Sequence, residues 1–155
     1  KFAKNYKNEN IVFKTKPMTS TRKAKELSNL KLNNCKLINQ GGSIDLIRNS
    51  KIVIAFNTTG ILEALIYNIP VIVPLFEDFK KKRNFMLNFG GLVYSPKSKK
   101  EMFDMLVAMK DKKRKLKKNH PVKLKKILTE HLGNNDGSSG RKLRTFLKKN
   151  IYNNF

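Results

Sequence analysis

The sequence predicts a parallel α/β fold in a single domain that covers residues 1–155, and three observations support this prediction. Short apolar runs alternate with segments of helical spacing through the first hundred residues, a pattern typical of parallel sheets flanked by helices. Residues 52–56 are nearly all apolar, as expected for a strand that is covered on both faces. The length suits one ordinary core, and the sequence contains no internal repeat.

The first fifty residues contain two short apolar runs, each followed by turn residues. Hydroxylated residues precede the segments of helical spacing, where they can cap a helix. The expected elements are a strand over 10–13, a loop over 14–17, a helix from Ser20 or Thr21 to about Leu30, a strand over 35–38, and a short helix capped by Ser43 with Ile44, Leu46 and Ile47 on its apolar side.

The clearest unit is a strand, a helix and a second strand between residues 52 and 73. The strand 52–56 leads into a polar turn, and apolar residues between 61 and 66 form the helix that follows. Asn68 and Pro70 stop this helix before a second buried strand over 71–73. Such a connection between parallel strands is expected to be right-handed.

The second half of the chain is predicted to be mainly helical. Gly90 and Gly91 break the chain before a last short strand, and Pro121 suits the first turn of a helix. The expected elements are a strand over 92–94, a helix opened by Ser98, a basic solvated helical end over 110–118, a helix from Pro121 to near Gly133, a polar loop over 134–140, and a final helix over 141–150 with Leu143, Phe146 and Leu147 facing inward.

Ligands of open parallel α/β sheets bind at the carboxyl ends of the strands. Three polar segments are expected at that edge: residues 14–17, 57–60 and 75–78. In the middle segment, Thr58 or Thr59 would begin a helix, where free backbone N–H groups favour a phosphate or another anion. Gly60 would let that ligand approach the backbone closely. Asn57 and both threonines are also good helix caps, so the turn either binds a ligand or simply starts the helix.

Other candidate residues carry two interpretations each. Glu63 lies one turn into the central helix, where it would either accept hydrogen bonds from a sugar or ribose hydroxyl or merely complement the helix dipole. Lys14 and Lys16 would either pair with phosphate or belong to the general lysine excess. Cys35 is the only cysteine, which excludes a cysteine-based zinc site, and no metal site is predicted.

The formal net charge of +23 suggests anionic partners, yet only six of the 34 basic residues are Arg. The lysine excess is typical of compositional bias, whereas Arg is preferred for reading bases and phosphates. Nucleic acid is therefore not the expected partner, since no helix-turn-helix, zinc-finger or RNP-type pattern is present. The Lys-rich C-terminal region remains a candidate surface for an anionic membrane. The predicted location is cytoplasmic, with peripheral attachment to the inner face of the cell membrane as an alternative.

Residues 11–147, most of the chain, resemble the donor-binding, C-terminal half of GT-B glycosyltransferases, particularly those of bacterial capsule and surface-carbohydrate synthesis. The best part is residues 45–47 followed by residues 50–65, which resemble the segment in which a strand ends at a small hydroxylated pair before a Leu-Glu-Ala helix, here Leu62-Glu63-Ala64. Residues 68–74 resemble the following Gly-x-Pro-Val-Ile strand, with Asn68 in place of glycine. The late residues Asp136, Gly137, Ser138 and Arg141 are similar to the Asp-Gly segment before the last helix.

The resemblance implies a Rossmann-like parallel sheet flanked by helices, as one half of a GT-B architecture whose N-terminal half lies outside this sequence. It implies a metal-independent glycosyltransferase with a nucleotide-sugar as donor substrate and no separate cofactor. Asn57, Thr58, Thr59 and Gly60 would hold the phosphates, with Asp136, Gly137 and Ser138 as further contacts. Related capsule transferases have Lys-x-His-Pro where this chain has Lys14-Thr15-Lys16-Pro17. A nucleotide-sugar epimerase, or a basic module that binds anionic membrane or nucleic acid, is the alternative.

Overall fold

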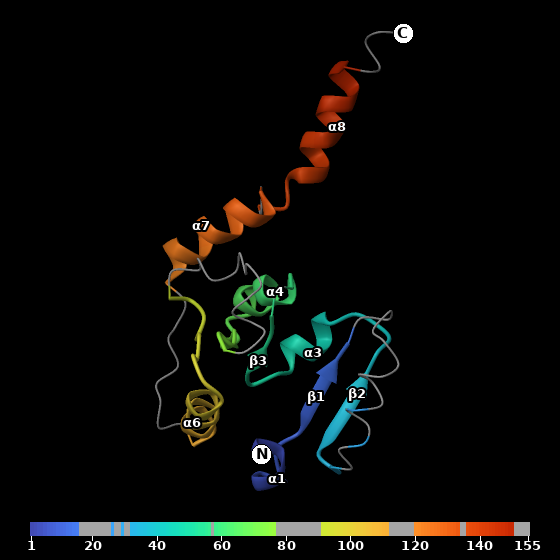
Figure 1. Cartoon of the computed structure of the whole chain (residues 1–155). Coiled ribbons are helices and arrows are strands. Elements are labelled where there is room, and N and C mark those ends of the chain that lie inside the picture. The colour runs from blue at the N-terminus through green and yellow to red at the C-terminus, as the bar shows by residue number, and fades with distance from the viewer. Residues whose placement is uncertain are drawn as a thin grey trace.

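The structure is a computed structural model (Figure 1) that describes residues 1–15, 26, 29, 32–56, 58–76, 91–111, 120–133 and 136–150. Several expectations concern residues outside these ranges. They are most of the expected helix up to Leu30, most of the basic helical end after Lys110, the end of the loop after residue 76, and the candidate site residues Lys16 and Asn57.

The described strands form two parallel pairs, which confirms a mixed α/β fold. In the first pair, β1 (Ile11–Lys14) lies beside β2 (Cys35–Ile38), and Ile11 is opposite Cys35. In the second pair, β3 (Val53–Ile54) lies beside β4 (Val71–Ile72). Among the described residues each sheet has two strands, so the single larger sheet expected from the sequence is reduced to two short pairs.

The strand expected over 92–94 is present only as a single parallel bridge between Ile72 and Tyr94. Two backbone hydrogen bonds support this bridge: the Tyr94 N–H donates to the Val71 carbonyl at 2.9 Å, and the Val73 N–H donates to the Tyr94 carbonyl at 2.8 Å. This segment therefore extends the edge of the β3–β4 pair beyond β4.

Local signals in the sequence account for the ends of several helices. Asn68 has a positive φ of 56°, a conformation that Asn tolerates well, and it lies two residues beyond the central helix. Pro121 occupies a first-turn position and Gly133 the C-cap of one helix, as expected. The helices in chain order are α1 (Phe2–Asn5), α3 (Ile44–Arg48), α4 (Gly60–Ile66), α6 (Lys99–Lys110), α7 (Pro121–Leu132) and α8 (Ser139–Asn150).

The start of α6 confirms the prediction that Ser98 opens this helix, and Ser98 occupies its N-cap position. The Ser98 hydroxyl oxygen accepts a hydrogen bond from the Glu101 backbone N–H at 3.1 Å. The Glu101 carboxylate in turn accepts one from the Lys97 N–H at 2.7 Å. This exchange resembles a capping box and satisfies two donors near the helix start.

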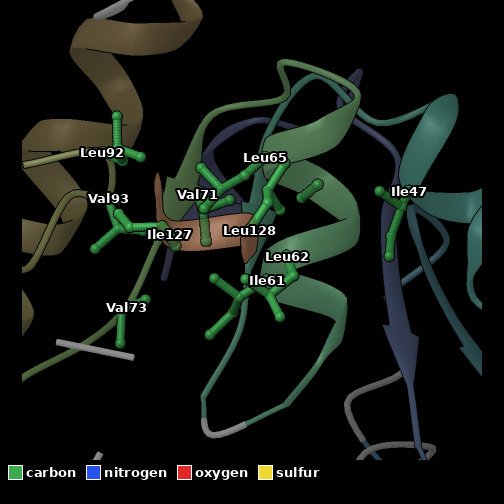
Figure 2. Packing of buried hydrophobic residues seen from close by; sticks show 11 residues of the cluster. Ile47, Ile61, Leu62, Leu65, Val71, Val73, Leu92, Val93, Ile127 and Leu128 are labelled. Carbon is green, nitrogen blue, oxygen red and sulfur yellow. The ribbon is translucent and has the colours of Figure 1, made fainter. Parts of the chain in front are cut away.

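Buried side chains lie on both sides of β4, because successive residues of a strand point to opposite faces. Val71 and Val73 join α4 and α7 in one cluster, where Leu65 of α4 lies near Leu128 of α7 (Figure 2). Ile72 points to the other face and packs with residues of α6. The β3–β4 pair is thus a thin layer between helices, as in α/β proteins.

Two predictions of burial are wrong. Residues 52–56 were expected to be covered on both faces, but Ile54 is 48% exposed, because the described segments cover its face of β3 only in part. The final helix begins at Ser139 rather than Arg141, and its apolar residues do not face inward. Leu143 is 58% exposed and Phe146 61% exposed, while Leu147 is half-buried.

No helix among the described residues combines the length and apolar character needed to cross a bilayer.

Candidate functional site

The turn before α4 begins the helix as predicted, with Thr59 at the N-cap position and Gly60 as the first helical residue. Neither threonine caps in the expected way, since the Thr59 side chain makes no capping hydrogen bond. The Thr58 hydroxyl oxygen instead accepts a long hydrogen bond of 3.4 Å from the Gly60 N–H. Thr59 is exposed and Thr58 is half-buried, so both hydroxyls lie at or near the surface.

The backbone N–H groups of this first turn are engaged within the chain, contrary to the expectation that they would be free. Leu62 donates to the Thr59 carbonyl at 2.9 Å, and Glu63 donates to the same oxygen at 3.2 Å. Ile61 donates to the Thr58 carbonyl at 3.2 Å. An anion at this turn would therefore rely on side-chain donors and on shared, longer N–H bonds rather than on a free row of amides.

The local structure does not require a glycine at position 60. Its φ is not in the left-handed region, and a Cβ added there would meet the Ile47 side chain at 3.6 Å and the Thr58 hydroxyl at 3.7 Å. Both distances are ordinary van der Waals contacts, so alanine would fit without moving a neighbour. The expected close approach of a ligand to this backbone is neither obstructed nor demanded by the packing.

Glu63 has a partner that the sequence did not reveal. The Ser43 hydroxyl donates a hydrogen bond to Glu63 Oε2 at 3.1 Å, and both side chains are half-buried. Ser43 occupies the N-cap position of α3 as predicted, but its side chain does not cap that helix. The bond joins the loop after β2 to the first turn of α4, which follows β3. The bond therefore holds the start of α3 against the start of α4.

Two polar side chains, Lys14 and Thr15, lie at the end of β1. Lys14 Nζ donates to the neighbouring Thr15 carbonyl at 2.9 Å. The Thr15 hydroxyl oxygen is buried and has no hydrogen-bond partner among the described residues. Buried polar atoms are normally satisfied, so this hydroxyl is notable. Sequence reasoning singled out Lys14 and missed Thr15, although the residue lies inside the polar segment that follows β1.

Asp136, Gly137 and Ser138 form a turn that leads into α8. Asp136 Oδ1 accepts a hydrogen bond from the Ser138 N–H at 2.8 Å, and Gly137 has a positive φ of 75°. Ser138 is buried, and its carbonyl accepts from the Lys142 N–H at 2.9 Å. This geometry is that of a turn that leads into a helix, in which the aspartate satisfies a backbone N–H before the helix.

The strongest candidate site is therefore the edge that holds Ser43, Thr58, Thr59, Gly60 and Glu63. It offers hydroxyl groups, one fixed carboxylate and an unobstructed glycine backbone, a set suited to a polyhydroxylated ligand carrying an anionic group. No group of three or more His, Cys, Asp or Glu side chains that could hold a metal ion occurs in the described ranges. No protein-family model, curated protein or solved structure matches this chain.

Proposed function

We propose that this chain binds a nucleotide-sugar at the edge beside Thr58, Gly60 and Glu63, as the Rossmann-like donor domain of a bacterial surface-polysaccharide glycosyltransferase. The observation that carries the proposal is the hydrogen bond from Ser43 to Glu63, which holds a carboxylate beside the turn after β3. Ligands of α/β proteins bind at this edge of the sheet. The resemblance of residues 50–65 to the donor half of GT-B enzymes supports the same ligand class.

The carboxylate of Glu63 would recognise the sugar or the ribose. Ser43 engages Oε2, and a carboxylate has a second oxygen that accepts further hydrogen bonds from ligand hydroxyls. Because the Ser43 bond restricts the side chain before the ligand arrives, less rotamer entropy is lost on binding. Hydrogen bonds between hydroxyls and a charged acceptor are also stronger than those between neutral groups.

The phosphates would lie against the turn itself. Thr58 and Thr59 provide hydroxyl donors, and Gly60 lets a phosphate oxygen approach the backbone. Lys14 ends β1 and supplies a positive charge that favours a diphosphate. Fixed donors at this position would also stabilise the charge that develops on the nucleotide as the glycosidic bond breaks.

Catalysis would require more than this domain. In a GT-B enzyme the donor and acceptor meet between two Rossmann-like halves, so the acceptor site and the catalytic base would come from a second domain. Such a protein would act in the cytoplasm, where nucleotide-sugars are made, and would need no metal ion.

The sharpest test is Gly60→Ala, with Gly140→Ala in α8 as the matched control. Neither substitution meets a close neighbour in the protein, since a Cβ at Gly60 makes only ordinary contacts and one at Gly140 meets nothing within 4 Å. Calorimetric titration with UDP-, GDP-, CDP- and CMP-linked sugars should detect binding to the unchanged chain. We expect Gly60→Ala to weaken this binding at least tenfold with no loss of stability, and Gly140→Ala to leave it unchanged.

Glu63→Gln separates sugar recognition from phosphate recognition. Loss of hydrogen bonds to a charged acceptor costs about 1.5–3 kcal/mol, or roughly 10- to 100-fold in affinity. This loss should appear for the nucleotide-sugar and not for the free nucleotide, whereas Glu130→Gln on α7 should change neither affinity.

If no nucleotide-sugar binds, or if Gly60→Ala binds as well as the unchanged chain, the proposal is wrong. Product analysis without an acceptor would separate an epimerase from a transferase.

A further inference from the structure

Helix α8 carries three apolar side chains on one side, of which two are largely exposed and Leu147 is half-buried. Leu143, Phe146 and Leu147 follow the i, i+3, i+4 spacing that places residues on one helix face. Leu143 is 58% exposed and Phe146 is 61% exposed. Figure 1 shows α8 extending beyond α7 and away from the described strands.

Every charged residue of α8 is basic. Its sequence contains no Asp or Glu. At 100° per residue, Lys142 and Arg144 flank the apolar face on either side, and Arg141 and Lys148 lie on the opposite face. All the described cationic side chains of α8 are exposed: Arg141, Lys142, Arg144 and Lys148.

We propose that α8 is an interfacial helix that binds the surface of an anionic phospholipid bilayer. Leu143, Phe146 and Leu147 would enter the boundary between head groups and acyl chains, and the flanking cations would contact the anionic head groups. Twelve residues span about 18 Å at 1.5 Å per residue, which is too short to cross a bilayer but sufficient to lie along its surface. This proposal rests on α8 alone and is independent of the nucleotide-sugar site.

Charge complementarity favours this occupant over the others. A second copy of the chain would bring another all-cationic helix against the first, so like charges would oppose the contact. A nucleic acid would use the cations but would gain little from exposed leucines, because phosphate contacts dominate such binding. An anionic membrane accommodates the apolar face and the cations that flank it at once. An acidic protein surface is the competing outcome of the experiment.

The expected affinities follow from the two contributions. Each cationic side chain near an anionic membrane contributes roughly fivefold in binding at low salt, so removing the two flanking cations should weaken binding about 25-fold. The electrostatic part should decline steeply as salt rises, since it is screened over about 10 Å at 0.1 M ionic strength. Replacing the three apolar side chains by serine should weaken binding at least tenfold by removing apolar area from the interface.

Cosedimentation of the full chain with phosphatidylcholine vesicles, with and without phosphatidylserine, measures these effects. The cationic double variant is Lys142→Gln and Arg144→Gln, which removes the two cations that flank the apolar face. Its control removes the same charge from exposed positions elsewhere, with Lys36→Gln and Lys100→Gln. The apolar triple variant is Leu143→Ser, Phe146→Ser and Leu147→Ser, and its control is Val122→Ser on α7, where Val122 is also exposed. We expect binding only to the anionic vesicles, lost in both α8 variants and kept in both controls.

Tryptophan fluorescence gives an independent readout, because the chain contains no Trp. Phe146→Trp should show a blue-shifted emission with anionic vesicles, and brominated lipids should quench it, whereas Val122→Trp should show neither effect. The proposal is overturned if anionic vesicles do not bind, if the charge-matched control weakens binding as much as the α8 variant, or if the apolar triple variant binds normally. Binding of α8 to an acidic polypeptide without vesicle binding would overturn it in favour of a protein partner.

Discussion

The hydrogen bond between Ser43 and Glu63 joins two residues that are twenty positions apart in the sequence, and its contribution to stability can be measured. Ser43 precedes α3, and Glu63 lies in the first turn of α4. A double-mutant cycle with Ser43→Ala and Glu63→Ala removes each partner alone and both together. The difference between the double variant and the sum of the single variants isolates the interaction.

The size of the coupling free energy between Ser43 and Glu63 follows from the geometry of their hydrogen bond. A hydrogen bond to a charged acceptor contributes about 1.5–3 kcal/mol to stability when it is shielded from water. Ser43 and Glu63 are both half-buried and 3.1 Å apart, so water competes for each of them. We therefore expect a coupling free energy of about 1 kcal/mol. In a chain of 155 residues, a destabilisation of this size lowers the melting temperature by about 2–4 °C.

Urea denaturation followed by circular dichroism measures the four stabilities in the cycle. A second cycle pairs Glu63→Ala with Ser98→Ala, which lies at the start of α6 and serves as the unlinked control. Distant substitutions usually add within about 0.3–0.5 kcal/mol, so the control should show no coupling above that level. A coupling between Ser43 and Glu63 that is no larger than the control would refute the role assigned to this bond.

Two further predictions concern the helices around the site. Leu65→Ala should lower the free energy of unfolding by about 2–5 kcal/mol, because Leu65 is 0% exposed in the main cluster. Ile66 is 49% exposed on the same helix, so Ile66→Ala should lower it by less than about 1 kcal/mol, and urea midpoints of the two variants test this difference. Ser98→Ala should cost about 1 kcal/mol by removing the acceptor for the Glu101 N–H, and Ser98→Thr should restore most of it; equal stability of all three chains would contradict the capping role.

The central strand–helix–strand unit was predictable because its signals are local. The apolar run over 71–73 is buried, and α4 begins and ends where the Thr58–Thr59–Gly60 turn and Asn68 indicate. The position of Glu63 among buried apolar neighbours also follows from helical spacing. Breakers, caps and periodicity act over a few residues, so a single sequence suffices to locate them.

Contacts between distant segments were not predictable in the same way. The sequence gives no signal that the Ser43 hydroxyl turns away from its own helix to Glu63, since a serine before a helix is an ordinary cap. The exposure of Ile54 has a similar cause. An apolar strand indicates that burial is favourable, but the neighbouring segments decide which side chains are covered.

Helix α8 shows the limit of periodicity most clearly. The spacing of Leu143, Phe146 and Leu147 predicted one apolar face, and the helix has such a face. The further step, that this face points inward, was wrong, because spacing alone does not identify what covers a helix. Large exposed apolar groups on a cationic helix are instead typical of a surface that meets another phase or partner.

The bond to Ser43 makes Glu63 a structural link between two segments, in addition to the ligand contact proposed for it. These roles are compatible, because Ser43 donates to Oε2 and a carboxylate accepts several hydrogen bonds. Replacing Ser43 would leave the Glu63 carboxylate in place and only let its side chain adopt more rotamers. Ligand affinity should therefore fall less than when the carboxylate itself is removed. If Glu63 were only a structural link, substituting either Ser43 or Glu63 would lower stability, and neither substitution would change ligand affinity. Comparing stability with affinity across the same variants therefore distinguishes a site from a link.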